Sequence, residues 1–411
     1  MKKYFILAVA ALAASVACSK VETEFNPTDP GNKIAFEVAN YATQTKANVA
    51  LTNAEDGIYQ FHTVANQFPA IGSPVQFMDV DILPWNGTTQ VTSANISSNN
   101  ITAWAPADDY FWPKTGYINF YSYAGTAAPT VDNSAADKKT VKFAYNNVTI
   151  DANANILVAD AALHYARANS ATETYPVDNS ETSGHITKGV PTLFHHQLAK
   201  IIVDVEARTT DAKKSANTIW KVQVLKAYDA TNVSTISPIN KGSLALTSAD
   251  ASTTAETVAW TKDNENATNI SGWVPGTDKE TIELNDSEVL TIDVNQTSSG
   301  APNEILAARS VMPQLTSGVD FKLTYKVQAL HGSTVFMEEI RTVGIDAAAV
   351  IGDLANTVTS WKANQKITYH IIIDPVSEKV TFDPAVEEYD AIDADGTVDE
   401  ININENGLVT P

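Results

Sequence analysis

The chain has 411 residues, of which 44% are hydrophobic and 18% charged, and its formal net charge is −21. This hydrophobic content allows a sizeable core, and the length favours two domains. The negative charge argues against a nucleic-acid-binding protein and against attachment to anionic lipid through charge. A single cysteine excludes a disulfide framework, so core burial must stabilise the fold.

Residues 1–17 predict a signal peptide. Two lysines precede an apolar run from Tyr4 to Ala17, which is too short to span a bilayer. The run ends in SVAC at residues 15–18, which has the form of a lipobox. Cys18 would then become the first residue of the mature chain and carry the lipid. The alternative is an ordinary secretory signal with a cysteine at its cleavage site.

A polar tether follows the leader and ends in a short predicted strand over residues 33–39. Ile34, Phe36 and Val38 recur at every second position and therefore share one face. The next basic residue is Lys46. Residues 18–46 thus form a leader segment that contains the first strand.

The rest of the chain reads as strands separated by turns. Pro84–Gly87 predicts a hairpin turn, and residues 346–361 form the most helix-like segment. Alternating apolar residues predict strands over residues 76–82, 116–124, 139–150, 156–159, 191–205, 220–227, 243–246, 290–294, 305–312, 321–327, 333–340 and 366–373. The pattern predicts an all-β protein built from sandwiches. The long polar stretch His164–Lys188 marks the boundary between a domain over 47–190 and a domain over 191–389.

The sequence contains no arrangement typical of an enzyme, a metal site or a cofactor site. His195 and His196 are adjacent on a predicted strand and face opposite ways, so a structural role is favoured over metal binding. The usual nucleophile motifs and phosphate-binding loops are absent. Asp390–Gly396 resembles a calcium loop, but Ala391 and Asn402 stand where carboxylates are required.

An aromatic cluster lies in the first half of the chain. Such residues could stack on sugars, but in a sandwich they more often form the core. The cluster consists of Trp104, Tyr110, Phe111, Trp112, Tyr117, Phe120, Tyr121 and Tyr123.

Residues 390–411 form an acidic C-terminal tail. Ile401 and Ile403 alternate with asparagines, which is the pattern of a strand. One interpretation is a frayed terminus. The other is a donor strand that pairs with an exposed sheet edge of another molecule.

Several segments, taken in order, resemble the fimbrillin family, the subunits of bacterial type V pili. The most specific are YFWP at 110–113 and FHHQLAK at 194–200. The others are the lipobox, IAF at 34–36, the basic residue at 46, GYINF at 116–120, ILVA at 156–159, VMPQ at 311–314 and WKANQKITY at 361–369.

The resemblance implies two transthyretin-like β-sandwich domains and export to the cell surface as an outer-membrane lipoprotein precursor. It also implies cleavage between Lys46 and Ala47. The cut would release the first strand and open a groove for a neighbour's tail. In this chain the released residues would be Ile34, Phe36 and Val38, and the donor residues would be Val398, Ile401, Ile403 and Leu408.

The sequence therefore predicts a non-enzymatic subunit of a surface fimbrium that supports adhesion. Its expected partners are other fimbrial subunits, the outer membrane through the lipid on Cys18 before processing, and a host or bacterial surface receptor. A pilus tip adhesin, a glycan-binding surface lipoprotein and an uncleaved pilus anchor are the alternatives.

Overall fold

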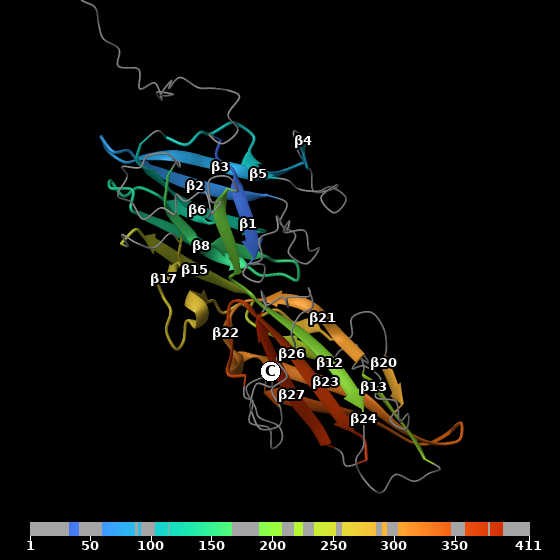
Figure 1. The fold of residues 1–411 in the computed structure, drawn as a ribbon. Helices are drawn as coiled ribbons and strands as arrows, with labels where there is room; N and C mark the ends of the chain where they lie inside the picture. Colours follow the sequence, from blue (N-terminus) through green and yellow to red (C-terminus); the bar gives the residue numbers. More distant parts are fainter. Residues whose placement is uncertain are drawn as a thin grey trace, which may run out of the picture.

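The fold is an all-β sandwich, as the sequence predicts (Figure 1). The computed structural model describes residues 33–40, 60–86, 89–91, 103–113, 115–166, 189–207, 218–224, 234–251, 257–284, 290–293, 303–346, 358–376 and 379–388. In these ranges the helical elements are two short 3-10 turns, η3 (Ile270–Gly272) and η4 (Thr316–Gly318). None of the helices described there is long and apolar enough to cross a membrane.

The N-terminal strands form a sheet that closes on itself. Its strands pair in the order β6 (Tyr117–Gly125), β2 (Phe61–Phe68), β3 (Val75–Asn86), β5 (Ala103–Pro106), β1 (Phe36–Asn40), β11 (Val190–His196) and β9 (Ile156–Ala159). Because β9 also pairs with β6, these strands make a closed ring. Three further strands lie outside the ring path: β10 (Ala161–Tyr165) pairs with β6, β16 (Thr257–Val258) with β10, and β4 (Thr89–Gln90) with β3.

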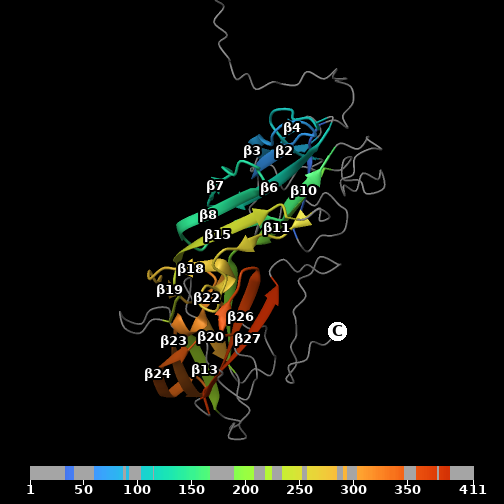
Figure 2. The ribbon, with the colours of Figure 1, turned by 90° about the vertical axis from the view of Figure 1, so that its left-hand side faces the viewer.

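A second sheet covers one side of this ring (Figure 2). It contains β17 (Thr261–Lys262), β15 (Lys241–Ala249), β8 (Thr140–Thr149), β7 (Thr130–Asp132) and β18 (Trp273–Pro275). Phe143 and Leu246 of this sheet belong to one buried cluster with Tyr121 of β6. On the opposite face of β6, Ile118 and Phe120 belong to the core inside the ring. Strand β6 is therefore buried on both faces.

Two further sheets form a sandwich in the C-terminal part. One pairs β21 (Asn303–Val311), β12 (Ala199–Ala207), β26 (Gln365–Asp374) and β27 (Lys379–Glu388) in this order. The other contains β19 (Ile282–Glu283), β14 (Thr235–Ser237), β23 (Asp320–His331), β13 (Ile219–Val224), β20 (Leu290–Asp293) and β24 (Thr334–Asp346). A short pair, β22 (Gln314–Leu315) with β25 (Ser360–Trp361), lies at one end.

The core of this sandwich consists of alternate residues from facing strands. Ile201 and Val203 of β12 meet Phe321 and Leu323 of β23 in one fully buried cluster. Tyr369 lies in the same cluster, and its hydroxyl accepts a 2.6 Å hydrogen bond from the buried indole nitrogen of Trp361. The apolar alternation read from the sequence is thus the inward face of the strands.

The prediction of a single strand over residues 191–205 is wrong. The segment forms β11 and β12, which belong to different sheets and are separated at Gln197 and Leu198. Both separating residues are buried, and the Gln197 backbone N–H donates to the carbonyl of Ile156. The chain therefore passes from one sheet to the other at the point where the alternation of buried and half-buried residues shifts by one position.

Three smaller predictions also differ from the structure. The predicted hairpin is present, since β3 pairs antiparallel with β4, but Pro84 and Trp85 belong to β3 rather than to the turn, and Trp85 pairs with Gln90. Asp346 ends a strand and β25 covers residues 360–361, so the described ends of the predicted helix are strands. The strands predicted from the sequence end at residue 373, whereas in the structure β27 follows β26.

The strand pairing bears on how the chain divides into domains. Strand β15 pairs with β8 along nearly its full length, and β16 pairs with β10. Strands β15 to β18 therefore lie with the N-terminal sheets in Figures 1 and 2. We propose two sandwich domains in tandem, with these strands joined to the first.

Candidate functional site

Strand β1 occupies the point where the N-terminal ring closes. It pairs in parallel with β11 over five residue pairs, from Phe36 opposite Val190 to Asn40 opposite Phe194. On its other side the antiparallel pairing with β5 has one residue pair, Phe36 opposite Trp104. Among the described strands, β1 alone connects β5 to β11. Its removal would open the ring and leave two unpaired strand edges.

The predicted inward face of β1 is buried in the ring. The exposed fractions of Ile34, Phe36 and Val38 are 2%, 1% and 3%. The ring of Phe36 lies edge-on to Phe61 and Phe120, at centroid distances of 5.5 and 5.6 Å. Burial of these three side chains contributes about 5–9 kcal/mol, at roughly 1.5–3 kcal/mol each. The slot therefore selects a strand with large apolar residues at every second position.

The residues just before β1 are held by weaker contacts than β1 itself. The backbone N–H of Ile34 donates to the carbonyl of Tyr110 at 2.8 Å. Lys33 forms a 2.7 Å ion pair with Asp109, but both side chains are about half exposed. Exposed ion pairs contribute about 0–1 kcal/mol. The apolar face of β1, rather than this charged contact, holds the strand in place.

The aromatic cluster is mostly core. Trp104, Trp112, Tyr117, Phe120 and Tyr121 are each at most 8% exposed. Burial raises the pKa of the Tyr121 hydroxyl well above its ordinary value. Tyr110, Phe111 and Tyr123 are half-buried. The cluster lines the interior of the ring and its junction with the second sheet, rather than an open platform.

The predicted histidine pair divides between different partners. His195 Nε2 lies 3.3 Å from Asp160 Oδ2, whereas His196 Nδ1 lies 3.1 Å from Asn155 Oδ1. His196 is buried and His195 is half-buried, as expected for adjacent strand residues. In the described part of the chain no group of three potential metal ligands occurs.

A buried polar network was not apparent from the sequence. Asp250 accepts a 3.0 Å hydrogen bond from the Asn119 side chain and lies 2.9 Å from His164 Nε2. Burial alone would raise the pKa of Asp250, but hydrogen bonds from His164 and Asn119 outweigh it and lower the pKa. The network joins β6 and β10 to the end of β15. It links the ring to the second sheet through residues far apart in the sequence.

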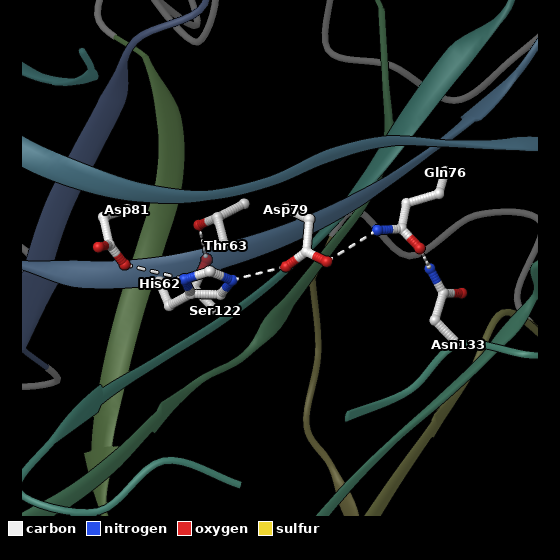
Figure 3. Close-up of polar contacts among 7 residues, drawn as sticks. All are labelled: His62, Thr63, Gln76, Asp79, Asp81, Ser122 and Asn133. Carbon is white, nitrogen blue, oxygen red and sulfur yellow. Dashed lines mark hydrogen bonds and ion pairs between the residues drawn. The ribbon is translucent and has the colours of Figure 1, made fainter. Parts of the chain in front are cut away.

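A second polar cluster lies on the outer side of the ring (Figure 3). His62 of β2 has Nε2 2.7 Å from Asp79 and Nδ1 2.9 Å from Asp81, both on β3. Gln76 donates a 2.9 Å hydrogen bond to the second oxygen of Asp79, and Asn133 donates to Gln76 at 3.2 Å. Both carboxylates are about half exposed. The cluster ties β2 to β3 on the side of the strands that faces solvent.

The remaining predicted site residues lie outside the described residues. These are the lipid-attachment residue Cys18, the processing residues Lys46 and Ala47, and the donor residues Val398, Ile401, Ile403 and Leu408. The calcium-loop segment at 390–396 also lies outside them. Of the site predicted from the sequence, the structure places the first strand, with all three of its apolar residues on one buried face.

Comparisons with known proteins give matches among solved structures. Two of them are fimbrial proteins. A fimbrial protein from Bacteroides vulgatus is 14% identical, with 87% of this chain and 99% of that chain covered and a TM-score of 0.45. The tip fimbrial protein Mfa3 from Porphyromonas gingivalis, with a C-terminal truncation, is 10% identical, with 87% and 99% covered and a TM-score of 0.30. No family model and no curated protein matches the chain.

Proposed function

We propose that this protein is a structural subunit of a bacterial surface fimbrium and that it polymerises by exchange of β1. The observation that carries the proposal is the position of β1. It lies at the start of the described chain, closes the ring between β5 and β11, and fills the ring interior with alternate apolar side chains. Once the backbone between β1 and β2 is cut, β1 can leave without breaking any other covalent connection in the ring.

The physical consequence of removing β1 supports assembly. Two strand edges would carry unpaired N–H and C=O groups, and the slot left by Phe36 would expose an apolar interior. A neighbour's C-terminal strand can satisfy both through backbone pairing and alternate side chains. Because such a contact runs head to tail, it does not close and it builds a filament. Backbone pairing and packing also overcome the repulsion between strongly negative subunits.

In the proposed sequence of events, Cys18 holds an outer-membrane lipoprotein precursor and β1 keeps its ring closed. Cleavage between Lys46 and Ala47 frees β1 together with the lipid. The tail of another subunit then inserts Val398, Ile401, Ile403 and Leu408. An uncleaved anchor would keep both Cys18 and β1, whereas the buried aromatic cluster offers no support for a glycan-binding platform.

N-terminal sequencing and intact mass of the protein from cells test the processing step. A chain that begins at Ala47 is expected in the polymer. A polymer built from chains that still contain β1 would contradict the proposal. Lys46→Gln should leave the lipidated precursor and remove the polymer.

Paired variants of the tail test the donor strand. Ile401→Asp with Ile403→Asp should abolish polymer, because it places two charges in the apolar slot. Asn402→Asp with Asn404→Asp adds the same charge to the opposite face and should leave the polymer in place. Equal polymer from both variants, seen by electron microscopy and denaturing gel, would exclude the tail as the donor.

A further inference from the structure

Strand β24 forms a long edge of the C-terminal sandwich. It pairs with β23 over its whole length, from Thr334 opposite His331 to Asp346 opposite Asp320. Within the described part of the chain no strand pairs with its other edge. A strand edge of this length presents a row of backbone groups to which another strand can add.

The edge lacks the two residue types that most directly prevent such pairing, and two of its large hydrophobic residues are exposed. Its sequence, TVFMEEIRTVGID, contains neither lysine nor proline. Val335 is 42% and Phe336 61% exposed, which makes Phe336 one of the most exposed large hydrophobic residues described. At Gly344 a side chain would meet no atom within 4 Å, so the surface there is open. The edge thus has both an unburied aromatic side chain and an uncovered backbone position.

We infer that β24 pairs antiparallel with β24 of a second copy of this chain, with Ile340 on the two-fold axis. In this register Phe336 lies opposite the partner's Gly344 and covers the open surface there. Met337 lies opposite the partner's Val343 on the core side. Aromatic residues stabilise sheets when they cover a glycine on the neighbouring strand. Both hydrophobic contacts occur twice because the interface is symmetric.

Charge selects the same register. Glu339 lies opposite the partner's Arg341, and Arg341 lies opposite the partner's Glu339. Within one chain these residues already share a face and pair at 2.8 Å, with the Glu339 side chain 53% exposed. The nearest other registers that keep the core-facing residues on one side of the sheet are shifted by two residues. One of them places Glu339 opposite the partner's Glu339, and the other places Arg341 opposite the partner's Arg341. Like charges directly opposite destabilise a strand pair.

The pairing does not depend on exchange of β1, because β24 lies in the other sandwich. It forms a closed pair with two-fold symmetry rather than an open chain. In an assembled fimbrium it would connect two filaments side by side. In an unprocessed subunit it would give a dimer.

Cysteine cross-linking tests the register. In a chain with Cys18→Ser and Lys46→Gln, β1 stays in place and an introduced thiol is the only one. Ile340→Cys should give a disulfide-linked dimer under mild oxidation, because directly opposed residues have Cα atoms about 4.5–5.5 Å apart. Glu338→Cys is the matched control: its copies lie four residues out of register, about 14 Å apart along the strand. A cross-link at 338 but not at 340, or equal cross-linking at both, would overturn the inferred pairing.

A charge exchange tests the partner residues. Glu339→Arg should weaken the dimer by about tenfold in sedimentation experiments, since it opposes two pairs of like charges. Glu339→Arg combined with Arg341→Glu restores opposite charges within and between chains and should return the dimer to its original strength. A parent chain that stays monomeric at all concentrations would overturn the inference, as would a double variant no stronger than the single one. Circular dichroism of each variant verifies that the fold is retained.

Discussion

The N-terminal ring and the C-terminal sandwich differ in whether the outer strands of their sheets are paired on both sides. The ring is continuous because β1 joins β5 to β11, so its strands have neighbours on both sides. The sandwich leaves β24 and β27 as outer strands of its two sheets. Edges are where strands from other molecules can add. One region would acquire edges by losing a strand, and the other has them in the folded chain.

The two regions also differ in where their charged groups lie. Asp250 and His164 form a polar contact with side chains only 2% and 7% exposed, between the ring and the second sheet. In the sandwich, His370 bridges Asp204 and Glu206 across neighbouring strands on a half-buried face. Removing one partner of a buried contact leaves an unsatisfied group in the interior, so it should cost more than removing one partner of a half-buried contact.

The largest effect is expected from an aromatic core residue in each region. Phe36→Ala and Phe321→Ala should each lower the free energy of unfolding by about 3–5 kcal/mol in the unprocessed chain. In the assembled polymer the effect of Phe36→Ala should disappear, because the donor strand has replaced β1. The effect of Phe321→Ala should persist. Thermal unfolding of monomer and polymer measures both, and an equal effect of Phe36→Ala in the two states would argue against strand exchange.

The buried contact between Asp250 and His164 should give the next largest effect. Asp250→Asn should cost about 1.5–3 kcal/mol, since it removes a charged hydrogen-bond partner of His164 in the interior. The lowered pKa of Asp250 means that its stabilisation is present above the ordinary aspartate pKa of about 3.9 and is lost as pH falls through the lower folded value. Denaturant unfolding at pH 7 and at acid pH measures this. Asp320→Asn is the control: its side chain is 81% exposed in an ion pair with Lys279, and little change is expected.

A smaller effect should follow from removal of one hydroxyl in the sandwich. Tyr369→Phe leaves the buried N–H of Trp361 without its 2.6 Å acceptor and should cost about 1–3 kcal/mol. Tyr145→Phe removes a buried hydroxyl of β8 that has no hydrogen-bond partner among the described residues, and it serves as the comparison. Chemical denaturation measures both, and equal losses would show that the Trp361 hydrogen bond contributes no specific stabilisation.

The smallest effect concerns pH in the neutral range. The hydrogen bond to Asp204 raises the pKa of His370 against the effect of burial, with a further contribution from Glu206. This stabilisation is complete below the ordinary histidine pKa of about 6.5 and is lost as pH rises through the higher folded value. The melting temperature should therefore fall over that window, and His370→Gln should flatten the profile. An unchanged profile in the variant would assign the pH dependence to other groups.

Much of this fold follows from alternation in the sequence, and the failures have local causes. The period of two at Ile34, Phe36 and Val38 predicts the buried face of β1 correctly. The segment 191–205 also alternates, but its phase changes between Phe194 and Ile201, and that shift is the signal for two strands. Strand β27 carries Pro384, which only an edge strand accommodates, and this residue concealed the strand.

The ring itself could not be predicted in this way. Alternation tells which side of a strand faces the core, but it does not identify the neighbouring strands. The partners of β1 begin at Ala103 and Val190, and the sheet that covers β6 includes β15. The network of Asn119, His164 and Asp250 depends on the same long-range pairing. Each of its residues reads as an ordinary polar residue in the sequence.

The parallel pairing of β1 with β11 has a consequence for folding. Phe36 pairs with Val190, so the strand made first must wait until nearly half of the chain has been synthesised before its ring can close. Contacts between residues so distant in sequence form slowly, because a large loop must be closed first. The second sheet waits longer still, until β15 and β18 have emerged. The C-terminal sandwich also depends on distant pairing, since β12 pairs with β26 from Lys200 opposite Lys366 onward, so neither part can complete its sheets from local contacts alone.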